Sequence, residues 1–338
     1  TGIMISFFIN YGIVTSAVAG TSLQWRIPFA LQIIPGVLLF IGLLFQNESP
    51  RWLIEKCRVA EALTALRRVR GESVDDSEIM QEFYEIKADF QGHQKLTLWQ
   101  QITASCKNRS TFYQVSIGVA LMFWQQWTGT NSINYYAPQI FSSIGLKGQT
   151  SALFATGIYG VVKVVMTSLT LMLATDQIGR KYSLMISSAG QAFSMIYIGI
   201  HGAKEATVAD SDLSGSGIFA IICVYLFVVF FSIGWGLVPY VLAAECSPNH
   251  LRSFSMALAL MTQWLINFVI ARVVPIMLNK ITYGTFLFFG GCSICCFLYA
   301  VVCVPETTYV SLEKIPKLFE GNSILIILRG AFLDTFPR

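Results

Sequence analysis

The sequence predicts an all-α protein that crosses a membrane several times. Of its 338 residues, 54% are hydrophobic and 12% are charged, whereas about 25% of the residues of an average soluble domain are charged. Apolar runs of about 20 residues, the length that spans a bilayer as a helix, recur along the chain. We place eight spans, at residues 1–20, 27–46, 113–137, 151–174, 183–201, 217–242, 254–277 and 285–304.

The distribution of lysine and arginine predicts how the spans are oriented. Basic residues are concentrated after the second, fourth, sixth and eighth spans, for example Arg51, Lys107, Arg180, Arg252 and Lys314. These positions share one side of the membrane if the spans alternate, and the positive-inside rule makes that side cytoplasmic. Residue 1 and the C-terminus are therefore both predicted to be cytoplasmic.

The one long polar stretch, residues 47–112, divides the spans into two before it and six after it. Its apolar residues recur at helical spacing, which predicts amphipathic helices on the cytoplasmic face rather than a catalytic domain. Many transporters consist of two six-helix halves. We therefore interpret residues 1–46 as the last two helices of a first half, residues 113–304 as a complete second half and residues 305–338 as a cytoplasmic tail. With four helices missing, we expect the chain alone to be inactive.

The third span contains many amide and phenol side chains, in FWQQWTGTNSINYYAPQIF at residues 123–141. They do not share one face of a helical wheel, so an unbroken helix would turn some amides toward lipid. Breaks near Thr128–Thr130 and at Pro138 would resolve this conflict, because irregular backbone at membrane depth occurs where it lines a cavity. Neutral donors and acceptors suit a ligand rich in hydroxyl groups.

Two later spans strengthen the prediction of a polar cavity. Two glycines and a proline interrupt the sixth span in SIGWGLVPYVLAAE, residues 232–245, and MTQWLINF in the seventh places Gln263 and Asn267 four residues apart on one face. Three spans thus offer amides and aromatic rings at membrane depth. The alternative is that these groups only hydrogen-bond neighbouring helices.

Charged side chains gather at the predicted cytoplasmic ends of the spans, in ESPR, DQIGRK and ECSPNHLR. We predict that they form ion pairs that hold the two halves shut and break during alternating access. The alternative is that they only solvate the helix ends and mark the topology. The residues assigned to this gate are Glu48, Arg51, Asp176, Arg180, Glu245, Arg252 and Glu306.

Lys163 lies near the middle of the fourth span, where a charge is costly and often functional. It either faces the cavity or caps a carbonyl, or it reaches the membrane surface by snorkelling. No Asp or Glu lies deep in any of the eight spans. We therefore expect the acid of a proton-coupled mechanism to lie outside this chain.

The sequence offers no basis for catalysis or for a bound cofactor. Cys292, Cys295 and Cys296 have helical spacing, but no histidine lies nearby, and we assign them to helix packing rather than to a metal. Neither a G-x-S-x-G element nor a Walker loop is present. We predict neither an enzyme nor an ATP-driven pump.

Five motifs resemble, in order, those of the sugar porter family of the major facilitator superfamily. QQWTGTNSINYY resembles its Q-Q-x-x-G-x-N-x-x-x-Y-Y element, NESPRWL its P-E-S-P-R-W-L and DQIGRK its D-x-x-G-R-R/K. GWGLVPYVLAAECSPNHLR resembles G-W-G-P-V-P-W-x-x-x-x-E-x-x-P-x-x-x-R, and PETTYVSLEKI resembles P-E-T-K-G-x-x-L-E-E-I. The motifs run from the fifth family helix to the twelfth, which is almost the whole chain.

The resemblance implies a major facilitator fold and a secondary transporter that moves a hexose or pentose by alternating access, coupled to protons. Asn47 and Leu237 replace family prolines, and Tyr240 replaces a family tryptophan, so the identity of the sugar stays open. The side chains that the resemblance assigns to substrate binding are Gln125, Gln126, Asn131, Tyr135, Tyr240, Gln263 and Trp264.

Two alternatives to sugar transport follow from the same resemblance. The third and fourth spans are most similar to fungal members, which include transporters of the cyclic polyol acid quinate, so quinate or another polyol is an alternative substrate. A sugar sensor that does not transport is another, although the tail here is short. The expected partners are a small sugar, protons and the lipid bilayer of the plasma membrane, and no nucleic acid.

Overall fold

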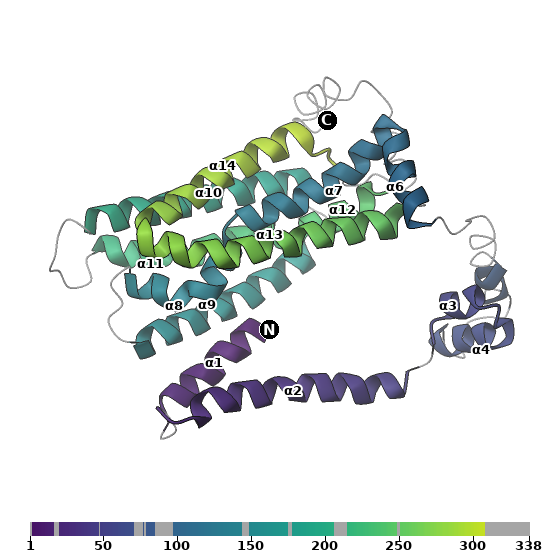
Figure 1. Ribbon diagram of the computed structural model, residues 1–338, viewed down its shortest axis with the longest axis horizontal. Coiled ribbons are helices and arrows are strands. Elements are labelled where there is room, and N and C mark those ends of the chain that lie inside the picture. Colours follow the sequence, from purple (N-terminus) through teal and green to yellow (C-terminus); the bar gives the residue numbers. More distant parts are fainter. Residues whose placement is uncertain are drawn as a thin grey trace. The chain divides into compact units, whose positions relative to one another are not determined.

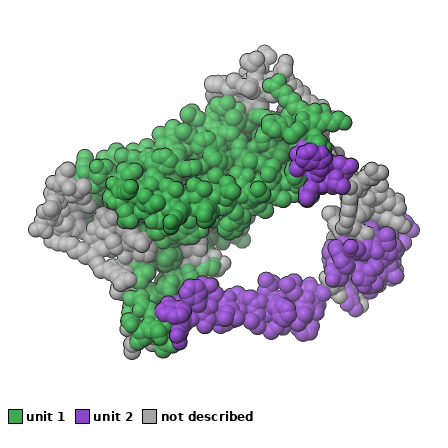
Figure 2. Space-filling view, viewed as in Figure 1, with its two compact units in different colours: residues 1–24, 103–338 green, residues 25–102 purple. Residues whose placement is uncertain are grey.

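Figure 1 shows a computed structural model of the protein, which is α-helical in the part of the chain that it describes apart from one π-helical turn. The described residues are 2–16, 20–46, 48–70, 77, 79–84, 97–143, 149–174, 178–205, 215–248 and 251–307. The chain divides into two compact units, residues 1–24 with 103–338 and residues 25–102, which are coloured separately in Figure 2.

The larger unit is a helix bundle. In it α10 packs against α11 and α14, α7 packs against α12 and α13, and α9 packs against α1, α8 and α11. The bounds are α1 Gly2–Val14, α7 Arg109–Trp127, α8 Thr130–Ser143, α9 Gln149–Leu169, a π-helical turn at Thr170–Ala174, α10 Arg180–Glu205, α11 Gly215–Ile233, α12 Val238–Cys246, α13 Arg252–Lys280 and α14 Tyr283–Cys303.

Six helical segments among the described residues are long and apolar enough to cross a membrane, and they correspond to six of the eight predicted spans. Of the other two, α1 has only 13 residues, and α7 carries an arginine and a serine at one end and two glutamines at the other. The six segments are Leu23–Leu44, Leu153–Met172, Arg180–Lys204, Gly215–Cys246, Arg252–Lys280 and Tyr283–Cys303.

The predicted break near Thr128–Thr130 is confirmed. α7 ends at Trp127 and α8 begins at Thr130, and Gly129 between them has a φ of +85°. Glycine adopts such angles without steric cost, and a Cβ at this position would lie 2.8 Å from the Phe289 ring. The helix therefore ends at a position where the backbone angle and the neighbouring ring both favour glycine.

The second predicted break lies two residues before Pro138. Tyr136 has non-helical angles, with φ −118° and ψ 16°, inside α8. Proline has no N–H to bond the carbonyl four residues earlier, so it breaks the helical pattern just ahead of itself. The third predicted span is thus interrupted twice. This agrees with the prediction that its amides, which do not share one face of a helical wheel, need a broken helix.

The sixth predicted span is also interrupted, as predicted. A turn at residues 234–237 separates α11 from α12, and Pro239 lies in the first turn of α12, where its missing N–H costs nothing. Trp235 in this turn is fully buried, and its Nε1 donates to the Ser188 hydroxyl of α10 at 2.6 Å. The indole therefore fixes the turn against the bundle.

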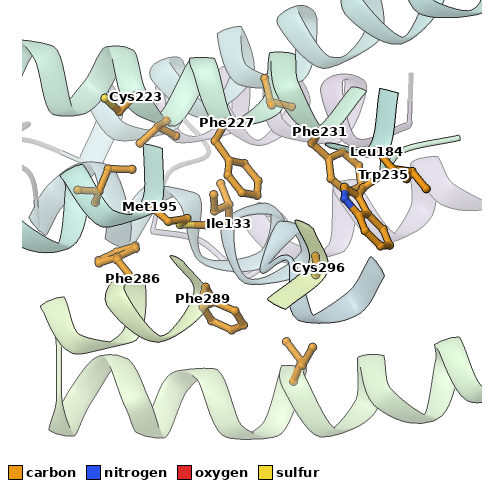
Figure 3. Packing of buried hydrophobic residues seen from close by; sticks show 14 of the residues in the cluster. Ile133, Leu184, Met195, Cys223, Phe227, Phe231, Trp235, Phe286, Phe289 and Cys296 are labelled. Carbon is orange, nitrogen blue, oxygen red and sulfur yellow. The ribbon is translucent and has the colours of Figure 1, made fainter. Parts of the chain in front are cut away.

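Apolar side chains from all the helices from α7 to α14 fill the core of the larger unit. Figure 3 shows Phe227, Phe231, Phe286 and Phe289 pointing into the space between these helices. Cys296 is buried in the same core, whereas Cys295 is exposed. No group of three possible metal ligands occurs among the described residues.

The smaller unit contains α2 (Leu23–Leu44), α3 (Pro50–Glu55) and α4 (Val59–Arg70), with α6 (Leu98–Lys107) at its end. Leu53, Leu66 and Phe83 belong to a buried cluster formed by α3, α4 and residues 79–84. The amphipathic helices predicted for residues 47–112 are present where the chain is described. Residues 71–76, 85–96 and the tail from 308 lie outside the described residues.

Candidate functional site

Asn131 at the start of α8 is the centre of a hydrogen-bonded group of amides. Its Nδ2 donates to Gln126 Oε1 of α7 at 2.6 Å and to Asn267 Oδ1 of α13 at 3.0 Å. Asn267 Nδ2 lies 3.4 Å from the Tyr135 hydroxyl and donates to it. The bond between Gln126 and Asn131 crosses the break at Gly129, which separates α7 from α8.

A second branch connects Asn131 to α9. Asn134 Nδ2 donates to Asn131 Oδ1 at 3.3 Å. Asn134 Oδ1 accepts from the Tyr159 hydroxyl and from Lys163 Nζ, each at 3.2 Å. We call Gln126, Asn131, Asn134 and Asn267 the amide cluster.

Lys163 contacts the amide cluster and not a helix end. Its Nζ also lies 5.3 Å from the centre of the Phe231 ring. Of the interpretations left open by the sequence, the structure favours a lysine that faces polar groups within the bundle and bonds a side-chain carbonyl. Sequence reasoning missed Tyr159, although Tyr159 and Lys163 are four residues apart and therefore share a face of α9.

Gln125 joins the two interrupted spans. Its Nε2 donates to the carbonyl of Trp235, in the turn between α11 and α12, at 2.8 Å. Its Oε1 is buried and has no hydrogen-bond partner in the described part of the chain. A buried amide oxygen of this kind normally requires a donor from water or a ligand.

The remaining predicted binding residues fall into two groups. Gln263 Nε2 donates to the Tyr240 hydroxyl at 2.5 Å, which joins α13 to α12. Trp264 is 67% exposed. The structure therefore brings together Gln126, Asn131 and Tyr135, pairs Tyr240 with Gln263, and leaves Trp264 on the surface of the larger unit.

Arg180, Glu245 and Glu306 form a second polar group, at the N-terminus of α10. Arg180 Nη2 lies 2.9 Å from Glu245 Oε1, and the two side chains are 16% and 17% exposed. The Glu306 carboxylate accepts from the backbone N–H groups of Arg180 and Lys181, each at 3.1 Å. A carboxylate at a helix N-terminus is favoured by the unpaired N–H groups and by the helix dipole.

Two neighbouring residues complete this group. The Thr307 hydroxyl donates to Glu245 Oε2 at 3.2 Å. Gly179 has a φ of +87°, and a Cβ there would lie 3.0 Å from Glu306 Oε2. Glycine in DQIGRK therefore lets the carboxylate reach the helix end. We call Arg180, Glu245, Glu306 and Thr307 the charged cluster.

The charged cluster corrects one expectation about the gate. Arg180 and Glu245 both lie within residues 113–304, so their ion pair stabilises one predicted half and does not join the two. Arg252 begins α13, and Glu48 lies in the smaller unit. Asp176 and the side chain of Arg51 lie outside the described residues.

Comparison with known proteins identifies the family. Residues 1–319 match the family described as sugar (and other) transporters. A probable quinate permease of Aspergillus clavatus is 36% identical over 328 residues, and one of Aspergillus niger is 38% identical over 329 residues. Each alignment covers 96% of this chain and 61% of the relative. The chain belongs to the sugar transporter family.

Solved structures agree with this family assignment. The xylose transporter XylE from E. coli in its inward open conformation has a TM-score of 0.71 and 29% identity, covering 94% of this chain and 62% of XylE. The proton:xylose symporter XylE bound to 6-bromo-6-deoxy-D-glucose has a TM-score of 0.69 and 28% identity, covering 94% and 64%. The chain is an all-α, multi-pass membrane protein with the major facilitator fold, and it spans about three-fifths of the length of these relatives. The relatives are permeases and transporters, which agrees with the prediction that the chain is not an enzyme.

Proposed function

We propose that this chain forms part of a secondary transporter that moves a monosaccharide or a cyclic polyol across a membrane by alternating access. The observation that carries the proposal is the amide cluster, in which Asn131 joins α8 to α7 and α13 through neutral groups. Amides both donate and accept, so they exchange partners with hydroxyl groups at little electrostatic cost. The buried Oε1 of Gln125 adds an acceptor that a ligand hydroxyl would satisfy.

The predicted binding residues have different roles in this proposal. Gln126, Asn131 and Tyr135 bind the substrate directly, and Gln125 accepts a substrate hydroxyl. Tyr240 and Gln263 form a hydrogen-bonded pair that extends the polar surface along α12 and α13. Trp264 contributes an exposed ring that can cover the C–H face of a sugar.

We further propose that transport is coupled to protons and that the charged cluster lies on the cytoplasmic side of the plasma membrane. The proton:xylose symporter XylE is a structural relative that supports proton coupling. The concentration of lysine and arginine beside Arg180 supports the cytoplasmic assignment. Residue 1 and the C-terminus are then cytoplasmic as well.

Quinate is a specific second candidate for the substrate. The curated relatives at 36% and 38% identity are named probable quinate permeases. Quinate is a cyclic polyol, so the amide cluster could bind its hydroxyl groups as it would bind those of a hexose. A sensor that binds without transport would share these contacts and differ only in the absence of flux.

Uptake measurements test the proposal. The complete coding sequence is expressed in a yeast strain that lacks hexose uptake, and entry of labelled glucose, xylose and quinate is followed over time. Saturable uptake of at least one compound, abolished by a protonophore, is the expected result. Asn108→Ala, which changes an exposed amide that makes no capping bond, should leave uptake unchanged, whereas Asn131→Ala should weaken it. Binding without uptake would favour the sensor. The absence of both binding and uptake would exclude the proposal.

A further inference from the structure

We propose that Lys163 binds a carboxylate of the substrate, and that the transporter therefore selects a polyhydroxylated carboxylic acid over a neutral sugar. This inference rests on the proposed function and specifies the chemical class of its substrate. It assigns a role to a charge that neither the helix packing nor the amide cluster requires.

Lys163 lies in α9, within the candidate membrane span Leu153–Met172. A cation at that depth is costly unless an anion or several polar groups compensate its charge. No ion pair of Lys163 occurs in the described part of the chain, where its neighbours are the neutral Asn134 amide and the Phe231 ring. The charge is therefore only partly compensated.

The hydrogen bonds of Lys163 leave room for a ligand. An ammonium group has three N–H donors, and the bond to Asn134 Oδ1 uses one of them. That oxygen is neutral and also accepts from Tyr159. Its hydrogen bond to the ammonium is therefore weaker than one from the ammonium to a carboxylate. In the part of the chain that the structure describes, no hydrogen-bond partner occupies the other two donors, which can bind a carboxylate.

The hydrogen bonds of the amide cluster run in one direction from Lys163. Lys163 donates to Asn134, Asn134 donates to Asn131, and Asn131 donates to Asn267 and Gln126. The cation therefore lies at one end of the chain, and neutral amides occupy the rest of it. One compound with a carboxylate near Lys163 and hydroxyl groups along the chain would satisfy both parts of the site.

The names of the relatives agree with this chemistry. Quinate carries several ring hydroxyl groups and one carboxylate, and relatives that align over 96% of this chain are named probable quinate permeases. A neutral hexose would use the amides but would leave Lys163 without an anion.

The test compares quinate with its methyl ester, which keeps the hydroxyl groups and lacks the charge. Uptake is measured in vesicles containing the protein made from its complete coding sequence. We expect the original protein to prefer quinate to the ester. Lys163→Met should raise the KM for quinate about 10- to 100-fold, as expected for a lost charge-assisted hydrogen bond, and should leave ester uptake within about twofold. Lys163→Arg should retain most quinate uptake, because it keeps the charge.

Lys280→Met is the matched control. Lys280 ends α13 and is exposed, so its loss should change neither uptake rate. The amount of folded protein is checked for each variant by size-exclusion chromatography. If Lys163→Met does not fold, the preference of the original protein for quinate over the ester still tests the substrate class, and Lys163→Arg still tests the role of the residue.

Three results would overturn the inference. Equal loss of quinate and ester uptake in Lys163→Met would show that Lys163 orients the amides or pairs with an acid elsewhere in the transporter. Uptake of glucose or xylose but not of quinate would leave the proposed function intact and remove the carboxylate role. Uptake of none of these compounds would overturn the proposed function, and this inference with it.

Discussion

The amide cluster and the charged cluster both join helices of the larger unit that are far apart in the sequence, and both do so through polar side chains. The amide cluster, centred on Asn131, uses neutral groups, whereas the charged cluster uses the ion pair of Arg180 and Glu245 at the N-terminus of α10. The difference lies in how easily each group can exchange its partners.

When a substrate hydroxyl replaces one hydrogen-bond partner of a neutral amide, the free energy changes little. An ion pair that loses one partner leaves an uncompensated charge, which costs several times more. The first arrangement suits a site that is filled and emptied in each transport cycle. The second suits a contact that holds one conformation until a larger change separates its parts.

Among variants of the two clusters, the largest effect is expected from Arg180. Arg180→Met removes the cation of the ion pair with Glu245, and because the pair is only about one-sixth exposed, the maximum transport rate should fall on the order of tenfold. Substrate affinity should change little, since the hydrogen bonds and ion pair described for the charged cluster involve no residue of the amide cluster. Vesicle flux and calorimetric binding measure the two quantities separately.

Two further variants sharpen this prediction. Arg180→Lys should restore the rate only partly, because lysine lacks the planar guanidinium. The double variant Arg180→Met with Glu245→Met should be faster than either single variant, because no charge is left unpaired. A loss of affinity with normal rates would instead assign Arg180 to substrate binding.

The break between α7 and α8 should be the next most sensitive point. Gly129→Ala forces a residue with Cβ to adopt a φ of +85° beside Phe289, which costs about 1–3 kcal/mol. The melting temperature of the purified protein should fall. Gly291→Ala in α14, where a Cβ would meet nothing within 4 Å, is the control. Equal melting temperatures for the two variants would contradict this role of Gly129.

Single amides should have a smaller effect. Gln126→Ala removes one hydrogen bond to Asn131, worth about 1 kcal/mol, so the KM should rise by about fivefold with expression unchanged. Asn131→Ala should have a somewhat larger effect because its Nδ2 bonds two partners. Unchanged KM values in both variants would mean that the amides serve only helix packing.

The smallest effect is expected at the exposed ion pair of the smaller unit. Arg58 donates to Glu61 and lowers the pKa of that carboxyl below its ordinary value. A lowered pKa adds stability at neutral pH, and this stability is lost as the pH falls through the lowered value. Because the side chains are 48% and 58% exposed, solvent screens the pair. Glu61→Gln should therefore leave the melting temperature at pH 7 unchanged, and a clear decrease would contradict this estimate.

Several features of the fold could be predicted from the sequence because they depend on local chemistry. Gly129, Pro138 and the glycines near Trp235 specify the breaks through backbone geometry, and the amides had to avoid lipid. Six spans could likewise be predicted, because hydropathy depends only on the residues within each segment. The third span was also placed from its apolar run, and its polar residues then predicted the breaks.

The partners of the polar residues could not be predicted, because they depend on which helices are neighbours. Charge patterns placed Arg180 and Glu245 on one side of the membrane but did not show that they belong to one half. The contact of Lys163 with Asn134 requires α8 beside α9. Trp264 was assigned from its place in MTQWLINF and from the resemblance, neither of which shows whether a side chain is buried, and the structure exposes it.

The central claim is that the amide cluster binds hydroxyl groups of the substrate, and binding of deoxy analogues tests it most directly. Calorimetry compares the transported compound with analogues that each lack one hydroxyl, using the original protein and Asn131→Ala. We predict that one analogue binds the original protein about fivefold more weakly than the parent compound but binds Asn131→Ala no more weakly, because the variant has already lost that contact. If every analogue loses the same affinity in both proteins, Asn131 does not contact the substrate and the claim is wrong.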